Sequence, residues 1–141
     1  MRNIIFRGRS IPHHGKKEEW VYGFYSNYKG VNGRTHYISS DNGNSAAVRE
    51  ETVGQYTGLT DKNGKGIFEG DIISYDYIRY VEPQKTEGRV FYKNGSFLVN
   101  VYVGAVISMP LGYLFGDDVK VNTIEIVGNI HDMPDFQEEW K

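Results

Sequence analysis

The feature that most constrains this chain is a succession of short strand patterns divided by turn residues. Apolar and β-branched runs recur about every eight to twelve residues, which predicts a small sandwich or barrel of strands. Two Asn-Gly pairs, Asn32-Gly33 and Asn94-Gly95, are strong hairpin signals, because Asn and Gly tolerate the positive φ of a tight turn. Each pair is therefore expected to connect two antiparallel strands.

The predicted fold is mostly β. The expected strands are Ile4–Phe6, Trp20–Tyr28, Thr35–Ser39, Ile72–Tyr80, Gly88–Tyr92, Ser96–Tyr102 and Thr123–Val127. Glu82–Lys85 is expected to interrupt the strand pattern between Ile72–Tyr80 and Gly88–Tyr92. Only Ser45–Val53 has the pattern of a short helix, with Ser45 as its N-cap and Gly54 as its end. The sequence thus predicts an N-terminal β-hairpin region with one short helix. From Gly70 onward, the spacing predicts five strands in a C-terminal SH3-like barrel.

The stretch Val53–Ile73 gathers several turn signals in a short space. Gly54 and Gly58 flank a tyrosine, so the backbone there is expected to turn or to pass close to another segment. Asp61–Gly66 predicts a turn, because Asp and Asn side chains accept hydrogen bonds from the downstream backbone and glycine tolerates positive φ. Glu69–Asp71 then opens a β-branched strand.

Length sets the domain expectation. With 141 residues the chain is expected to form a single domain, 1–141, with possible sub-units over 1–50 and 51–141. If two sub-units exist, their seam is expected near Asn42–Glu51 or at the turn Asp61–Gly66.

Composition bears on the compartment. The chain has no cysteine, which excludes disulfides and thiolate metal sites and suits a reducing cytoplasm. Charge returns at Arg7 after a short apolar run, so no signal-peptide core is expected. Phe97–Phe115 is apolar, but its β-branched residues and Pro110 favour strands over a membrane-spanning helix. We therefore expect a cytoplasmic protein with no membrane partner.

Charge is distributed unevenly along the chain. Residues 1–70 carry ten Lys/Arg and seven Asp/Glu, whereas residues 71–141 carry six and eleven, so the formal charges are +3 and −5. The first seventeen residues hold a basic arm without an acid, made of Arg2, Arg7, Arg9, Lys16 and Lys17. This separation suits head-to-tail self-association or a contact with an anion. A solvated surface is the plain alternative.

Residue patterns for catalysis or metal binding are incomplete. There is no cysteine and no G-x-S-x-G motif, and the histidines are scattered, so no nucleophile, metal or cofactor is expected. Asp61–Gly64 begins like a calcium loop but lacks its remaining ligands. Glu69 and Asp71 would share one strand face, and could act as an acid/base pair, if a strand ran through both. The alternative is that both cap a turn and stay solvated.

Aromatic residues offer a candidate binding strand. The candidate site consists of Tyr75, Tyr77, Arg79 and Tyr80. Exposed rings on such a strand could stack on nucleotides or grip a peptide. The alternative is a half-buried aromatic face of a sheet, in which the rings pack in the core.

Several motifs, in this order, resemble the YopX family of bacteriophage and prophage proteins. They are Glu19–Tyr25 (EWVYGFY), Thr52–Leu59 (TVGQYTGL), Asp61–Lys65 (DKNGK), Ile67–Ile73 (IFEGDII) and Ile124–Ile130 (IEIVGNI). The family-motif residues singled out are Gly54, Gln55, Tyr56, Thr57, Gly58, Glu69, Gly70 and Asp71. Departures lie in loops, at Gly66, Arg49-Glu50 and Met133–Phe136. The resemblance implies a mostly β protein with an SH3-like barrel, a phage or prophage origin in a low-GC Gram-positive host, and self-association. It implies no activity.

The predicted function is a non-enzymatic module that binds a protein, either a second copy of itself or a host or phage protein. The first alternative is a nucleic-acid-binding accessory protein that uses the basic arm and the strand Tyr75–Tyr80, although the net charge of −2 weakens it. The second alternative is a hydrolase that uses Glu69 and Asp71.

Overall fold

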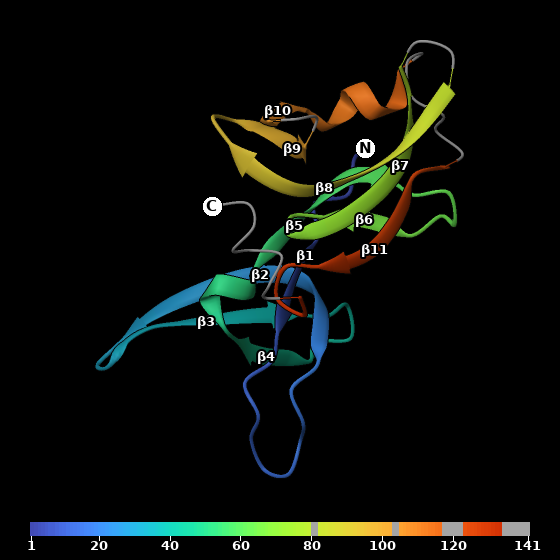
Figure 1. Cartoon of the computed structure of the whole chain (residues 1–141). Helices are drawn as coiled ribbons and strands as arrows, with labels where there is room; N and C mark the ends of the chain where they lie inside the picture. Colours follow the sequence, from blue (N-terminus) through green and yellow to red (C-terminus); the bar gives the residue numbers. More distant parts are fainter. Residues whose placement is uncertain (80–81, 103–104, 117–122, 134–141) are drawn as a thin grey trace. The chain divides into compact units, whose positions relative to one another are not determined.

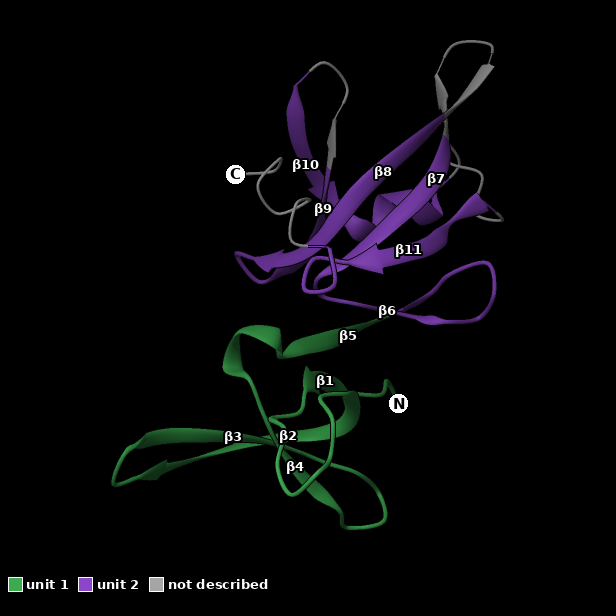
Figure 2. Cartoon of the chain, turned by 60° about the horizontal axis from the view of Figure 1, so that its bottom comes forward, with its two compact units in different colours: residues 1–58 green, residues 59–141 purple. Residues whose placement is uncertain are grey.

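The computed structural model describes residues 1–79, 82–102, 105–116 and 123–133. The chain divides into two compact units, residues 1–58 and residues 59–141 (Figure 2). The boundary lies a few residues before the turn at Asp61. The strands belong to two antiparallel sheets (Figure 1), of which one has the order β4-β3-β2-β1-β5-β6 and the other β10-β9-β8-β7-β11. The fold is therefore mostly β, as the spacing of strand patterns predicts.

Unit 1 is built from a strand meander. Its elements are β1 (Phe6–Arg9), β2 (Trp20–Gly30), β3 (Gly33–Ser39), β4 (Ser45–Val48), a 3₁₀ turn η1 (Glu50–Thr52) and β5 (Gly54–Thr60), whose last two residues lie past the unit boundary. β1 pairs antiparallel with both β2 and β5. Ile38 and Val48 are each 2% exposed and form the apolar interior of this small unit.

The helix predicted over Ser45–Val53 is wrong. Ser45–Val48 forms β4, which pairs with β3, and η1 is a single 3₁₀ turn. The Ser45 Oγ lies 2.7 Å from the Ser39 Oγ across the two strands, so it makes a cross-strand hydrogen bond in place of an N-cap. Burial of Val48 against β3 outweighs the weak helix propensity of this short segment.

The connection between β2 and β3 differs in detail from the predicted turn. Gly30 pairs with Gly33, so the two-residue connection is Val31-Asn32, and the glycine of the Asn-Gly pair already belongs to β3. The second Asn-Gly pair is itself the connection between β8 and β9. There Asn94 and Gly95 have φ of 53° and 80°, the backbone that a two-residue hairpin requires.

Unit 2 contains the five-stranded sheet. Its elements are β6 (Gly66–Phe68), β7 (Asp71–Arg79), β8 (Glu82–Lys93), β9 (Ser96–Tyr102), β10 (Val106–Pro110), a 3₁₀ helix η2 (Leu111–Phe115) and β11 (Glu125–Asn129). Among the described residues, five strands follow Gly70, the number that the spacing predicts. Among the described strands, β10 and β11 are the two edges of this sheet, so its hydrogen bonds do not close a barrel.

The break predicted at Glu82–Lys85 is also wrong, because this segment starts β8 and pairs with β7. Proline lacks an N–H and is normally excluded from the interior of a sheet. Pro83 is tolerated here because β9 pairs with β8 only from Gly88 onward, so the described pairings at Pro83 lie on one side of the strand.

The core of unit 2 is a single apolar cluster. Its buried members are Ile67, Ile73, Tyr75, Val90, Val99, Leu111, Leu114 and Ile124. Within the apolar window Phe97–Phe115, the described residues include β9 and β10, so the expected strands are present, and the 3₁₀ helix η2 follows them. No helix within the described residues is long and apolar enough to cross a membrane.

Candidate functional site

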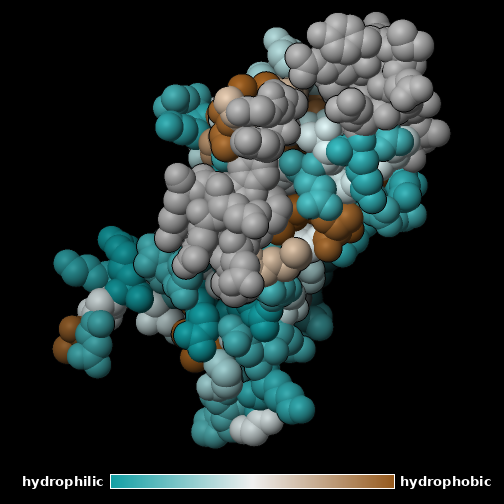
Figure 3. Space-filling view, viewed as in Figure 1, coloured by the Kyte–Doolittle hydropathy of each residue, from teal (hydrophilic) through white to brown (hydrophobic). Residues whose placement is uncertain are grey.

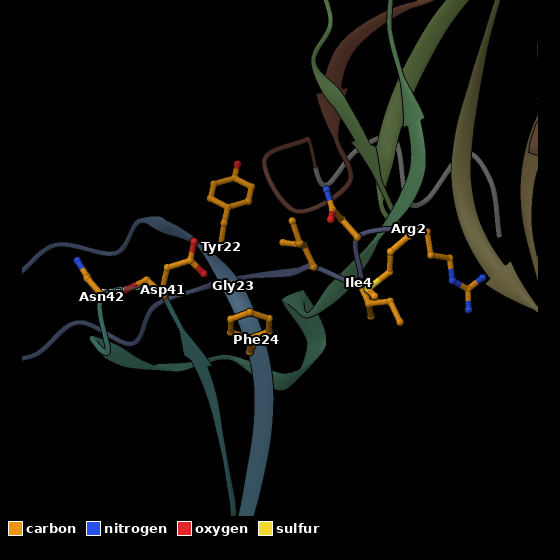
Figure 4. Close-up of a pocket in the computed structure, with 11 residues that line it drawn as sticks. Arg2, Ile4, Tyr22, Gly23, Phe24, Asp41 and Asn42 are labelled. Carbon is orange, nitrogen blue, oxygen red and sulfur yellow. Dashed lines mark hydrogen bonds between the residues drawn. The ribbon is translucent and has the colours of Figure 1, made fainter.

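Unit 1 has a hollow of about 830 Å³ beside β2. Three segments form it: the N-terminal segment with Arg2 and Ile4, the part of β2 around Phe24, and the loop after β3 with Asp41 (Figure 4). The rings of Tyr22 and Phe24 are 48% and 58% exposed, and Ile4 is 49% exposed. We call this set of residues the aromatic hollow.

Gly23 allows the unusual backbone conformation of β2 beside the hollow. It has a φ of 153°, and a Cβ placed on it would lie 2.0 Å from the Ser39 carbonyl oxygen of β3. No other residue type can occupy this position without moving one of the two strands. The strands therefore approach closely at Gly23, and this positions the two rings on either side of it.

The basic arm does not form one surface. Arg7 is 5% exposed, and its guanidinium carbon lies 4.6 Å from the centre of the Trp20 ring. Arg9 lies 5.4 Å from the same ring and pairs with Glu18 at 3.3 Å. Arg2 lines the aromatic hollow. The arm is thus divided between packing positions in β1 and the hollow.

The last two members of the arm, Lys16 and Lys17, are exposed in the loop between β1 and β2. An antiparallel bridge between His13 and Lys16 narrows this loop. These two lysines therefore present their charge to solvent from the loop, whereas Arg7 and Arg9 lie in β1.

Among the candidate binding residues of the aromatic strand, Tyr75 lies in the core. Tyr75 is 2% exposed and belongs to the core cluster, so its ring is not available for stacking on a ligand. This matches the alternative of an aromatic sheet face packed in the core. Tyr77 and Arg79 lie in β7, and Tyr80 lies outside the described residues.

The family-motif residues include several that make backbone hydrogen bonds between segments of the fold. Gly54, Gln55, Tyr56, Thr57 and Gly58 lie in β5, where the Tyr56 N–H donates to the Ile5 carbonyl (2.7 Å). Glu69 and Gly70 form the turn before β7. The Gly70 N–H donates to the Val90 carbonyl, and its own carbonyl accepts from the Ile130 N–H, both at 2.8 Å. These two bonds therefore join the turn before β7 to β8 and to the residue that follows β11.

Glu69 and Asp71 do not share a strand, because β7 begins at Asp71. Asp71 is 1% exposed, and its Oδ2 accepts a hydrogen bond from the Phe68 N–H at 2.8 Å. Asp71 thus caps the turn, as the alternative reading predicts, although its carboxylate is buried rather than solvated. The geometric condition for an acid/base pair on one strand face is not met.

Asp61 is a buried residue whose importance the sequence shows only in part. Its Oδ1 accepts from the N–H groups of Asn63 (2.9 Å) and Lys65 (3.0 Å), as the turn pattern predicts. Its Oδ2 accepts from the N–H of Ile126 in β11, at 3.1 Å. Burial alone would raise the pKa of Asp61. The hydrogen bonds from Ile126, Lys65 and Asn63 outweigh burial and lower it, with help from the charge of Lys65.

Three interacting side chains in unit 1 form a group that the sequence does not reveal. The Tyr25 hydroxyl lies 2.6 Å from His36 Nδ1, and His36 Nε2 lies 3.4 Å from a carboxylate oxygen of Glu50. The rings of Tyr25 and His36 stack with centroids 5.8 Å apart. Because His36 is 9% exposed, these contacts satisfy a buried imidazole. Among the described residues, no group of three His, Asp or Glu side chains is arranged to hold a metal ion.

These features define a mostly β protein of two antiparallel sheets with an exposed aromatic hollow in its first unit. The chain belongs to the YopX family, whose model, described as YopX protein, matches residues 12–137.

Other comparisons add little. A solved structure similar to the chain is the crystal structure of protein EF1440 from Enterococcus faecalis, with 20% identity and a TM-score of 0.46 over 96% of this chain and 99% of that one. A search of curated proteins finds no match.

Proposed function

We propose that this YopX-family protein is a non-enzymatic interaction module whose partner is a second copy of the same chain. The aromatic hollow carries this proposal. Phe24 is 58% exposed and Tyr22 is 48% exposed, and neighbouring large apolar side chains on one face are typical of a surface that a protein partner covers. Rings in a hollow can anchor a partner at low entropic cost, because aromatic side chains have few rotamers.

The charges favour a copy of this chain as the occupant. Residues 1–58 carry eight Lys/Arg and five Asp/Glu, whereas residues 59–141 carry eight and thirteen, giving +3 and −5. Arg2 lines the hollow, so an acidic surface of a second chain would be attracted to it. We therefore expect the first unit of one copy to contact the second unit of another. A host or phage protein with an acidic surface would compete for the same place.

The same proposal includes a phage or prophage origin and a cytoplasmic location, on the strength of the family resemblance. It also includes an SH3-like arrangement of the second unit. The strand order β11-β7-β8-β9-β10, with the 3₁₀ helix η2 between β10 and β11, supports this arrangement, since the last strand returns to lie beside the first.

Sedimentation velocity over a hundredfold range of concentration tests the proposal. The wild-type protein should move from monomer to a larger species as concentration rises. Phe24→Ser should weaken association about tenfold, because removal of a hot-spot aromatic typically costs 1–2 kcal/mol or more. Tyr28→Ser is the matched control, because Tyr28 is 65% exposed in the same strand but does not line the hollow. A wild-type protein that stays monomeric throughout would refute self-association.

A further inference from the structure

We propose that the tip of the β2–β3 hairpin binds double-stranded DNA. β1 pairs with β2 over residues 20–23, and β4 pairs with β3 over residues 36–39. Between these two regions, residues 27–35 form a ribbon of two strands within the part of the chain that the structure describes. We call residues 27–35 the β2–β3 arm, and Figures 1 and 2 show it extending from the rest of unit 1.

The arm is unlike an ordinary hairpin because the described residues bury neither of its faces. Each of its residues is exposed. An isolated two-stranded hairpin is marginally stable in water, so a protruding ribbon has little value for the fold itself. The Tyr28 and Tyr37 rings contact each other edge to face with centroids 5.8 Å apart, which stiffens one side of the arm at its base. A stiffened, fully exposed ribbon is suited to contact another molecule.

The charge of the arm indicates an anionic partner. Residues 20–40 contain no Asp or Glu. Lys29 and Arg34 are directly opposite each other in the hairpin register, and like charges in this position destabilise a pair of strands. The Arg34 Nη1 donates a hydrogen bond to the Asn27 Oδ1 at 2.6 Å. Because this acceptor is neutral, the positive charges of Lys29 and Arg34 are not compensated by it. A phosphate backbone lying along this face would remove the repulsion.

The shape of the arm favours duplex DNA. The major groove of B-DNA, about 12 Å wide, admits a two-stranded β-ribbon, whereas the major groove of A-form RNA is too deep and narrow for side chains to enter. Tyr28 is 65% exposed, and Val31 at the tip is fully exposed. Figure 3 shows a hydrophobic spot at the end of the otherwise hydrophilic arm. Lys29 and Arg34 would contact phosphates while the tip meets the groove.

This surface is distinct from the basic arm at the start of the chain. Arg7 and Arg9 of that arm are engaged with Trp20, and Lys16 and Lys17 lie in a separate loop. Those two lysines give a control with the same change of charge.

Fluorescence anisotropy with a labelled 20-bp DNA duplex of arbitrary sequence tests the proposal. The double variant Lys29→Gln/Arg34→Gln should bind about tenfold more weakly at moderate salt. Its slope of log K against log salt should fall by about 2, because two phosphate contacts are lost. Lys16→Gln/Lys17→Gln should bind as the wild type does. Lys29→Arg/Arg34→Lys keeps both charges and should also retain binding.

Three results would overturn the proposal. The first is that the wild-type protein does not bind the duplex even at low salt. The second is an equal loss in both glutamine variants, which would mean that net charge alone is being measured. The third is equal binding of an RNA duplex of the same sequence, which a groove-fitting ribbon does not allow. Circular dichroism of each variant checks that the exposed substitutions leave the fold intact.

Discussion

At the scale of single residues, Asp61 shows how a buried carboxylate can hold distant parts of a chain together. Its two oxygens accept from backbone N–H groups on both sides, two from its own turn and one from Ile126 in β11. The turn is predictable, because Asp and Asn side chains accept from the backbone just downstream and Gly64 adopts a φ of 76°. The bond to Ile126 is not predictable, since it joins positions 65 residues apart.

Asp61→Asn should destabilise the protein by about 2 kcal/mol at neutral pH. The substituted amide can accept through one oxygen only, so either the turn or the Ile126 N–H loses its acceptor and faces an NH₂ group. Urea denaturation at pH 7 measures the difference. Asp41→Asn is the control, because Asp41 is exposed in the loop after β3 and should change the free energy of unfolding little.

The pH dependence of the same pair of proteins gives a second check on Asp61. Its pKa is lower in the folded chain than the ordinary value of 3.8. Its ionised form therefore adds stability above that ordinary value, and this contribution is lost as pH falls through the folded pKa. The gap between wild type and Asp61→Asn should narrow when the pH is lowered toward 3. A gap that stays constant would contradict the role of the ionised carboxylate.

At the scale of elements, the sequence predicts strands better than it predicts their ends and partners. Runs of apolar residues mark β7 and β9, where Ile72, Ile73 and Val99 are buried. The aromatic residues that mark β2 are instead exposed at Tyr22 and Phe24. The segment Ser45–Val48 has helix-compatible residues but becomes β4, since it covers an open edge of β3. Local propensity in a short segment is weak compared with burial against a neighbour, and the neighbour is not visible in the local pattern.

The candidate site shows the same limit. Tyr22 and Phe24 belong to a strand that the sequence marks clearly, but their exposure depends on the approach of β2 and β3 at Gly23. Conversely, Tyr75 and Arg7 look suited to binding by residue type and lie buried instead, at 2% and 5% exposure. Residue type and strand register are local properties, whereas the face that is covered depends on the packing of the whole unit.

Gly23→Ala tests how far the shape of β2 depends on one position. A Cβ there would lie 2.0 Å from the Ser39 oxygen at a φ of 153°, so the variant should lose at least about 2 kcal/mol of stability. Thermal unfolding followed by circular dichroism measures the loss. Gly30→Ala in the same strand is the control, because its Cβ would meet its nearest atom at 3.5 Å, an ordinary contact. Equal melting temperatures for the two variants would show that β2 shifts freely at Gly23.

At the scale of the whole molecule, the separation of charge matters more than its sum. The chain carries a net charge of −2, yet residues 1–58 carry +3 and residues 59–141 carry −5. A molecule of this kind attracts its own copies in one orientation and repels them in others, and the attraction weakens as salt shortens the range of the field. The apolar contact at the aromatic hollow is expected to be insensitive to salt or slightly strengthened by it.

Salt and charge reversal should therefore separate the two contributions to self-association. Raising NaCl from 50 to 500 mM should weaken association about tenfold by sedimentation equilibrium, because attraction between exposed charges is screened over this range. Lys16→Glu/Lys17→Glu changes the first unit from +3 to −1 and should weaken association even at low salt. Lys85→Glu/Lys93→Glu is the matched control, since it makes the same change in net charge but leaves the opposite signs of the units in place.

The two charge-reversal variants should differ in association only if unit 1 of one copy attracts unit 2 of another. The control should associate at least as strongly as the wild type, because it makes the acidic unit more acidic. If both variants lose association equally, the total charge governs it and the head-to-tail arrangement is wrong. If neither salt nor charge reversal has an effect, the rings of the aromatic hollow hold the assembly, and the Phe24→Ser variant then becomes the decisive measurement.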